Sequence, residues 1–166
     1  MTGSSYRAPW GGLVIGITVL LSLFLIGLPL YIHLFQTEQR SLSSVLIIIL
    51  PLIVIVASLF SIRCYQIEAG RLIVDRFVLS RTFELSGLQA VEADPHAMAS
   101  SIRTFGNGGF FSFSGWFRNK KLGAYRAFAT DFKRAVVLRF PDMILVVTPD
   151  DPTRFVEQIR SFAGLS

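Results

Sequence analysis

Side chains that perform acid–base or nucleophilic catalysis are sparse in this chain of 166 residues. It contains two histidines, His33 and His96, and a single cysteine, Cys64. Asp94 lies just before His96, but no serine or cysteine nucleophile is visibly paired with them. The adjacent carboxylates Asp150–Asp151 precede a proline, a pattern that favours a helix N-terminus, where a carboxylate caps backbone N–H groups. We therefore predict no catalytic activity, no metal site and no cofactor.

Cationic side chains offer binding chemistry instead. Arg118, Lys120 and Lys121 lie close together in the chain, and Arg126 follows them. With a formal net charge of +5, such a cluster suits an anionic membrane surface, where each basic residue contributes about 1 kcal/mol. We predict these four residues as a candidate site for anionic lipid headgroups; the alternative is a solvated basic face. Nucleic acid is not an expected partner, because the charge excess is small and the aromatic residues lie outside the basic cluster.

Residues 105–117 combine four glycines with six aromatic residues. A phosphate-binding glycine loop needs a strand before it and a helix after it, whereas the residues after this segment have the pattern of loop and strand. Three interpretations remain open. The segment is a wide hairpin or bulged loop whose aromatic rings pack on the domain, or a protein-binding patch, or a membrane contact. In the last case Phe110, Phe111, Phe113, Trp116 and Phe117 enter the headgroup region of the bilayer.

Two long apolar segments, residues 12–34 and 42–62, contain no Asp, Glu, Lys or Arg. Spanning the hydrocarbon core of a bilayer takes about 20 apolar residues at helical rise, and both segments reach that length. The polar residues 35–41 between them allow only a tight connection, so we predict an antiparallel transmembrane helical hairpin. Trp10 and Arg63 flank this hairpin, and we predict that an indole ring and a snorkelling guanidinium lie there at the membrane interface.

The chain thus divides into a short N-terminal tail (residues 1–11), the membrane hairpin (residues 12–62) and a soluble domain (residues 63–166). The last part contains 14 Lys and Arg and 10 Asp and Glu, an ordinary globular composition, and its length suffices for one small core. An even number of spans puts both termini on one side of the membrane. Basic residues are more numerous on that side, so we expect an integral inner- or plasma-membrane protein with both termini and the domain in the cytoplasm.

Short runs of alternating apolar and polar residues fill the soluble part and are typical of β-strands. We predict about seven strands, at residues 65–68, 71–75, 78–85, 88–93, 124–129, 135–140 and 143–147, with an irregular stretch at 96–123. An amphipathic helix follows Asp151-Pro152, with an apolar stripe formed by Phe155, Val156, Ile159 and Phe162. We therefore expect an α+β protein whose antiparallel β-sandwich or partly open barrel is covered by a C-terminal helix.

Three pieces of the soluble part share a pattern with a known family. Residues 65–74 look like an opening hairpin, and residues 85–92 look like the strand that follows it. The third piece runs from G-W-F-R-N-K-K-L-G at residues 115–123 to T-P-D-D-P at residues 148–152. Together they resemble the pleckstrin-homology-like (PH-like) domains of bacterial membrane proteins. The resemblance implies a barrel capped by a helix after two membrane spans, and it does not by itself assign an activity.

A membrane-anchored binding module without catalytic activity is our leading prediction. Its expected partners are the lipid bilayer, anionic lipid headgroups or another membrane protein. The alternative is a structural subunit of a membrane complex, in which Gly12, Gly16 and the prolines of the apolar segments pack against another protein's helices. An enzyme or a transporter is the third hypothesis. His96 is the residue to test for an enzyme, and a transporter is expected to carry an intramembrane charge, which both apolar segments lack.

Overall fold

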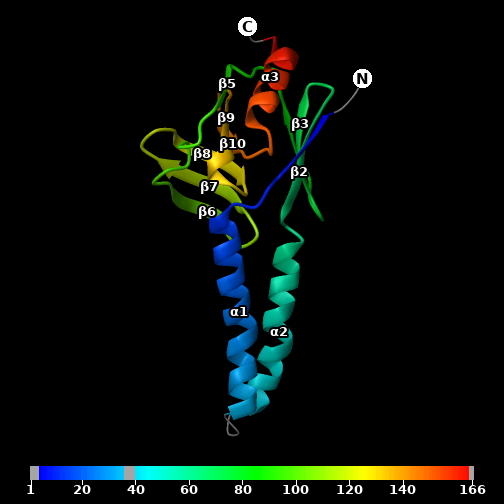
Figure 1. The fold of residues 1–166 in the computed structure, drawn as a ribbon, viewed down its shortest axis with the longest axis vertical. Helices are drawn as coiled ribbons and strands as arrows, with labels where there is room; N and C mark the ends of the chain where they lie inside the picture. The colour runs from blue at the N-terminus through cyan, green and yellow to red at the C-terminus, as the bar shows by residue number, and fades with distance from the viewer. Residues whose placement is uncertain (1–3, 36–39, 165–166) are drawn as a thin grey trace.

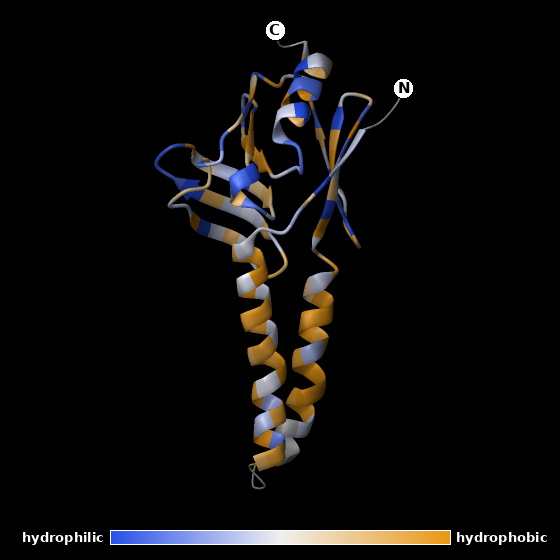
Figure 2. Cartoon of the chain, in the orientation of Figure 1, coloured by the Kyte–Doolittle hydropathy of each residue, from blue (hydrophilic) through white to orange (hydrophobic). Residues whose placement is uncertain are grey.

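The computed structural model describes residues 4–35 and 40–164, which form a pair of helices and a β domain at one end of that pair (Figure 1). Helices α1 (Gly12–Phe35) and α2 (Arg40–Ser58) lie side by side and run in opposite directions. Most of the polar connection predicted at residues 35–41 lies outside the described residues. Both helices are apolar along nearly their whole length, whereas hydrophilic and hydrophobic residues alternate through the β domain (Figure 2).

The two apolar helices differ in length. In the described part of the chain, α1 alone is long and apolar enough to cross a membrane, as predicted for residues 12–34. The second span predicted at 42–62 is not confirmed, because α2 ends at Ser58 and its apolar part, Ser44–Ser58, is shorter than the roughly 20 residues that a membrane span needs. The helix stops there because the chain turns and then enters a sheet at Ile62, where pairing with another strand replaces helical hydrogen bonds.

The first sheet is antiparallel and contains four strands in the order β1 (Ser4–Arg7), β2 (Ile62–Glu68), β3 (Arg71–Arg76) and β4 (Arg81–Glu84). Strand β1 lies in the N-terminal tail, for which the sequence predicts no strand. It pairs with β2 along its whole length, with Tyr6 opposite Tyr65. Because β1 precedes α1 and β2 follows α2, this pairing holds the near ends of both helices at the β domain (Figure 1).

The second sheet contains six strands in the order β5 (Ala90–Ala93), β9 (Val136–Arg139), β10 (Ile144–Val147), β8 (Gly123–Ala129), β7 (Phe113–Asn119) and β6 (Ile102–Gly108). Strand β10 runs parallel to β8, so the expectation of a purely antiparallel arrangement is wrong. The chain leaves β8 through the short 3-10 helix η2 (Phe132–Arg134) and returns as β9. Strand β10 therefore lies beside β8 in the same direction.

Strands β6 and β7 form a hairpin within residues 96–123, where the sequence predicts an irregular stretch. Gly106 and Gly115 lie opposite each other in this hairpin, with φ angles of 107° and 140°. A Cβ on Gly106 would lie 2.3 Å from the Ser114 carbonyl oxygen, and a Cβ on Gly115 would lie 2.2 Å from the Phe105 carbonyl oxygen. The close approach of the two backbones therefore requires glycine, and the missing side chains hide the alternating pattern of a strand.

Helix α3 (Pro152–Ala163) covers the core between the two sheets. It begins where the sequence predicts, because Asp151 caps it by accepting a hydrogen bond from the Arg154 N–H at 3.0 Å. Of the predicted apolar stripe, the first three residues are buried, but Phe162 is 48% exposed and does not belong to it. The α+β class, the sandwich of two sheets and the C-terminal helix are thus confirmed.

A second apolar cluster lies on the other face of the six-stranded sheet. It contains Met98, Phe117 and Tyr125 of the β domain together with Val14 of α1, all of them buried. Helix α1 therefore shares a core with the β domain over its first turns, and the junction between helix and domain is packed.

Candidate functional site

The four basic residues predicted to bind a ligand do not come together in one place. Arg118 and Lys120 are exposed, and Lys121 lies in the turn between β7 and β8, where it forms an ion pair with Asp94. Arg126 lies in β8 on the face that looks toward the first sheet. The cluster seen in the sequence is therefore divided between an outer corner of the domain and the space between the sheets.

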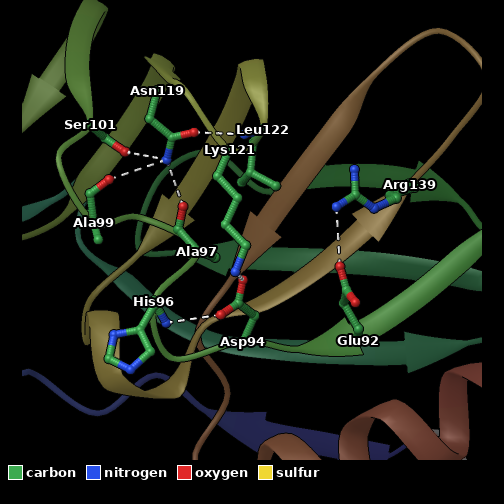
Figure 3. Close-up of polar contacts among 10 residues, drawn as sticks. All are labelled: Glu92, Asp94, His96, Ala97, Ala99, Ser101, Asn119, Lys121, Leu122 and Arg139. Carbon is green, nitrogen blue, oxygen red and sulfur yellow. Dashed lines mark hydrogen bonds and ion pairs between the residues drawn. The ribbon is translucent and has the colours of Figure 1, made fainter.

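A polar network holds the outer corner that carries Lys121 (Figure 3). The amide nitrogen of Asn119 donates to the Ala97 carbonyl at 2.7 Å and to the Ser101 hydroxyl at 2.9 Å. Its amide oxygen accepts a hydrogen bond from the Leu122 N–H at 2.7 Å. These bonds fasten the segment before β6 to the β7–β8 turn, so this corner has a structural role.

Asp94 anchors the same corner. Its carboxylate accepts hydrogen bonds from the Lys121 ammonium and, at 3.1 Å, from the backbone N–H of His96. Burial by itself raises the pKa of Asp94, but these hydrogen bonds and the nearby positive charge outweigh it and hold the pKa below its ordinary value. The imidazole of His96 points away from the carboxylate (Figure 3). The two side chains thus lack the geometry of an acid–base pair.

The tip of the β6–β7 hairpin, within the aromatic segment 105–117, touches α1. The Thr18 hydroxyl accepts a hydrogen bond from the Phe111 N–H at 2.9 Å and donates one to the Gly109 carbonyl at 3.4 Å. The ring of Trp10 packs edge to face on the ring of Phe111, with centroids 5.8 Å apart. Two of the residues predicted at the membrane interface therefore meet at the base of α1.

The remaining aromatic residues of the segment divide between the core and the surface. Phe113 and Phe117 are buried in the second apolar cluster, as the interpretation of packed rings expects, so the membrane contact predicted for these two rings is wrong. Phe110 is half-buried against Phe111, whereas Phe105 is 76% and Trp116 is 43% exposed. The segment is a hairpin whose rings partly pack on the domain and partly remain available for a contact.

Three arginines that are distant from one another in the sequence lie at the open edge between the two sheets. Arg76 ends β3 on the same face as the fully buried Leu72 and Val74, so its side chain points between the sheets. Arg81 lies opposite Val74 in β4 and shares that face. Arg126 approaches from the second sheet. We call Arg76, Arg81 and Arg126 the arginine cluster.

Aromatic rings separate the positive charges of the arginine cluster. The guanidinium carbons of Arg76 and Arg126 lie 4.8 Å and 5.1 Å from the centroid of the Phe128 ring, and Arg126 lies 5.7 Å from the Phe83 ring. Such cation–π contacts are favourable for partly desolvated guanidinium groups. Burial, together with repulsion from Arg81 and Arg126, lowers the pKa of Arg76, and burial with repulsion from Arg81 lowers the pKa of Arg126.

Within the described residues, no carboxylate forms an ion pair with the arginine cluster. The buried Nε of Arg76 also lacks a hydrogen-bond partner in this part of the chain. Asp75, the neighbour of Arg76, lies on the opposite face of the strand, where its carboxylate accepts a hydrogen bond from the Ser80 hydroxyl at 2.8 Å. The alternation of Leu72, Val74 and Arg76 in the sequence could have predicted that the Arg76 side chain points inward. It could not have predicted which residues of the second sheet lie opposite Arg76, because that depends on the tertiary fold.

A cavity of about 350 Å³ opens beside Arg76, between the end of α2 and the β6–β7 hairpin. Ala57 lines it from the last turn of α2 and Phe60 from the turn after that helix, and the hairpin contributes Asn107, Phe110, Ser112 and Ser114. The hydroxyls of the two serines lie 3.0 Å apart and form a hydrogen bond. A cationic donor, two hydroxyls and apolar walls thus surround a space large enough for a small anionic group.

Residues 4–35 and 40–164 contain no group of three His, Cys, Asp or Glu side chains that could hold a metal ion.

Comparison with protein families gives a match to the family model described as Bacterial PH domain, over residues 63–163. The matched range contains strands β3 to β10 and helix α3, and nearly all of β2. No curated protein matches the chain. Strand β1 and the two apolar helices lie outside the family match.

Proposed function

The chain belongs to the bacterial PH domain family, and we propose that it is a membrane-anchored binding module. In this proposal α1 and α2 lie in the bilayer as an antiparallel hairpin and hold the β domain against one membrane surface. The module binds anionic lipid headgroups or a protein partner and performs no catalysis itself. PH-like domains are typically binding modules, which supports this class of function.

The observation that carries the proposal is the exposed apolar surface of the two helices (Figure 2). On α1, Leu20 is 70%, Leu23 is 66% and Phe24 is 61% exposed, and on α2 Ile48 is 70% and Ile55 is 59% exposed. This surface continues along both helices and far exceeds the isolated apolar patches of soluble monomers. Such an apolar surface is unfavourable in water, and the acyl chains of a bilayer would surround both helices on all sides.

The pairing of β1 with β2 supports a hairpin rather than a single span. These two strands hold the start of α1 and the end of α2 at the same domain, so if α1 crosses the bilayer, α2 must return across it. At helical rise the apolar part of α2, Ser44–Ser58, extends about 22 Å, which is less than the hydrocarbon thickness of about 30 Å. The proposal therefore requires local thinning of the bilayer around α2.

We place the β domain and both termini in the cytoplasm. Arg7, Arg63 and Arg76 flank the helices on the domain side, whereas Arg40 lies at their other end, and basic residues favour the cytoplasmic side. We assign residues 12–58 to the membrane hairpin. The PH-like domain then comprises β1 and the chain from residue 62 onward.

Five residues form the interface with the membrane surface in this proposal: Trp10, Arg63, Phe110, Phe111 and Trp116. The contact between the Trp10 and Phe111 rings at the base of α1 supports it, as does the position of Arg63 one residue after β2 begins. The guanidinium of Arg63 also lies 4.8 Å from the ring of the exposed Phe77. Amphipathic rings and snorkelling arginines favour this level of the bilayer.

Alkaline carbonate extraction of membranes tests the anchoring. We expect the full-length protein to stay in the membrane pellet and to be released by detergent alone. Release by carbonate would refute an integral hairpin. A double variant, Arg118→Gln with Lys120→Gln, then tests whether the predicted basic residues of the outer corner add to binding of anionic liposomes by the reconstituted protein.

A structural subunit of a membrane complex is the second candidate, and the glycines of α1 favour it. A Cβ added to Gly12, Gly16 or Gly27 would meet no atom within 4 Å, so these positions are not used for packing inside the described chain. They leave room for another protein's helix. Affinity purification from detergent-solubilised membranes tests this function. A stoichiometric partner that is lost in Gly16→Leu but retained in Arg118→Gln would favour the subunit over the lipid-binding module.

A further inference from the structure

We propose that the arginine cluster of Arg76, Arg81 and Arg126 binds the phosphate of an anionic phospholipid headgroup at the membrane-facing edge of the sandwich. This inference deepens the proposed function and rests on it, because the lipid comes from the bilayer in which α1 and α2 lie. It assigns the ligand to residues other than Arg118, Lys120 and Lys121.

Carboxylates of the described residues do not neutralise the positive charge of the arginine cluster. Its three guanidinium groups repel one another, and no ion pair within the described residues neutralises them. The buried Nε of Arg76 is a charged donor without an acceptor in this part of the chain, which is unfavourable unless a ligand supplies one. Guanidinium groups bind phosphate oxygens through paired N–H donors, so a phosphate meets this requirement.

The position of the cluster favours a ligand from the membrane. Arg76 lies opposite Ile62, the first residue of β2, only a short turn after the end of α2. The end of β2 that joins α2 is the end of the first sheet nearest to the helices (Figure 1). With the helices in the bilayer, Arg76 lies at the level of the headgroups, where lipid phosphates are concentrated.

The connection between β3 and β4 adds an apolar contact beside the cluster. Phe77, Val78 and Leu79 follow Arg76 directly and are 61%, 55% and 50% exposed. Three consecutive exposed apolar residues are unfavourable in water, and at the boundary between headgroups and acyl chains they bury their side chains. A soluble phosphate would leave this loop uncovered, so the loop favours a phospholipid as the source of the phosphate.

The cavity beside Arg76 offers room for the rest of the headgroup. Its volume is about 350 Å³, and Ser112 and Ser114 are among the residues that line it. Phe60, from the turn between α2 and β2, supplies an apolar wall toward the proposed bilayer. By contrast, the positive charge of Lys121 at the outer corner is already neutralised by its ion pair with Asp94, so Lys121 is less suited to bind a phosphate.

Lipid titration of the full-length protein, purified in a nonionic detergent, tests the site. The probes are short-chain phosphatidylglycerol, short-chain phosphatidylcholine and inorganic phosphate, and calorimetry measures the affinity for each. We expect phosphatidylglycerol to bind at least about tenfold more tightly than the other two probes, a difference of about 1.4 kcal/mol. The choline cation of phosphatidylcholine is repelled by the arginines, and inorganic phosphate has no acyl chains to cover the apolar loop. Arg76→Gln and Arg81→Gln should each remove most of this preference.

Two further variants separate loss of the site from a general charge effect and from unfolding. Lys133→Gln removes the same charge from an exposed position in η2 and should leave the affinity unchanged. Arg81 is exposed, so Arg81→Gln provides a folded variant even if the partly buried Arg76 cannot be replaced. Equal loss in Lys133→Gln would show a general charge effect and overturn the site.

The failures of the two proposals are distinguishable. Wild-type protein that resists carbonate extraction but shows no preference for phosphatidylglycerol would overturn the lipid site and leave the anchored module intact. Equal affinity for inorganic phosphate would overturn the assignment to a phospholipid. Release by carbonate would overturn the anchor, whatever the titration in detergent gives.

Discussion

The Thr18 hydroxyl is the polar link between α1 and the β domain, and replacing Thr18 by valine tests how tightly the two are joined. Thr18 is 7% exposed, and its hydroxyl accepts the hydrogen bond of the Phe111 N–H at 2.9 Å. Its second bond, to the Gly109 carbonyl, is 3.4 Å long and contributes little. Thr18→Val keeps the shape of the side chain but leaves the Phe111 N–H without a partner. Because Phe111 is only half-buried, we expect a cost of about 1–2 kcal/mol.

That cost appears as faster opening of the hairpin tip. A change of about 1–2 kcal/mol corresponds to roughly 5- to 30-fold faster amide exchange at residues 109–112. Hydrogen–deuterium exchange with mass spectrometry on the full-length protein in lipid nanodiscs measures it. Thr82→Val, at an exposed position of β4, is the matched control and should not alter the tip. Unchanged exchange at the tip in Thr18→Val, or equal acceleration over the whole domain, would refute the local link.

Three further substitutions, two of them with a comparison variant, test the domain itself. Tyr65→Phe should lower the free energy of unfolding by about 2–3 kcal/mol, because the buried hydroxyl donates to a backbone carbonyl at 2.7 Å and accepts from a backbone N–H at 3.2 Å. Thermal unfolding followed by circular dichroism should show a smaller loss for Tyr125→Phe, whose hydroxyl bonds one serine. Gly106→Ala should disrupt the β6–β7 hairpin, since its Cβ would lie 2.3 Å from a backbone oxygen, and limited proteolysis should then cleave residues 102–119. The pKa of Asp94 is lowered in the folded state, so its carboxylate stabilises the fold above an unfolded pKa of about 3.9 and loses that effect as the pH falls through the folded value. Asp94→Asn should therefore destabilise at pH near 7 and progressively less at acidic pH in denaturant titrations, whereas the exposed Asp142→Asn should have little effect at either.

Features that depend on local chemistry could be predicted from the sequence. Helix α3 begins at Pro152 because Asp151 can cap it and proline suits the first position, and both facts are visible in the chain. The hairpin of β2 and β3 follows from two alternating runs separated by Ala69-Gly70, where both residues adopt positive φ. The first apolar helix follows from its length and lack of charge.

Features that depend on partners distant in the chain could not be predicted in this way. Strand β1 has four residues and no alternation of its own, and it exists because β2 offers an edge to pair with. The same competition shortens α2, since Ile62 belongs to the sheet although its side chain is as apolar as those of the helix. Strands β6 and β7 were hidden by Gly106 and Gly115, where backbone contact replaces side-chain pattern.

The predicted ligand residues show the same limit. Arg118, Lys120, Lys121 and Arg126 are neighbours in sequence, but the β7–β8 turn sends the side chain of Lys121 to Asp94. Arg126 instead faces Arg76, which belongs to the other sheet. Strand register and the packing of the two sheets decide which cationic side chains lie close together. The number and spacing of charged residues in the sequence predict neither of these.

Site-directed labelling of single cysteines tests the central claim, a hairpin of α1 and α2 in the bilayer with the β domain on the cytoplasmic side. In a Cys64→Ala background, cysteines replace Leu23 in α1, Thr37 between the helices and Ser161 in α3. A membrane-impermeant maleimide should label position 37 only from outside and position 161 only in inverted vesicles, and it should not label position 23 until detergent is added. Labelling of position 23 in intact vesicles, or of positions 37 and 161 from the same side, would contradict the account.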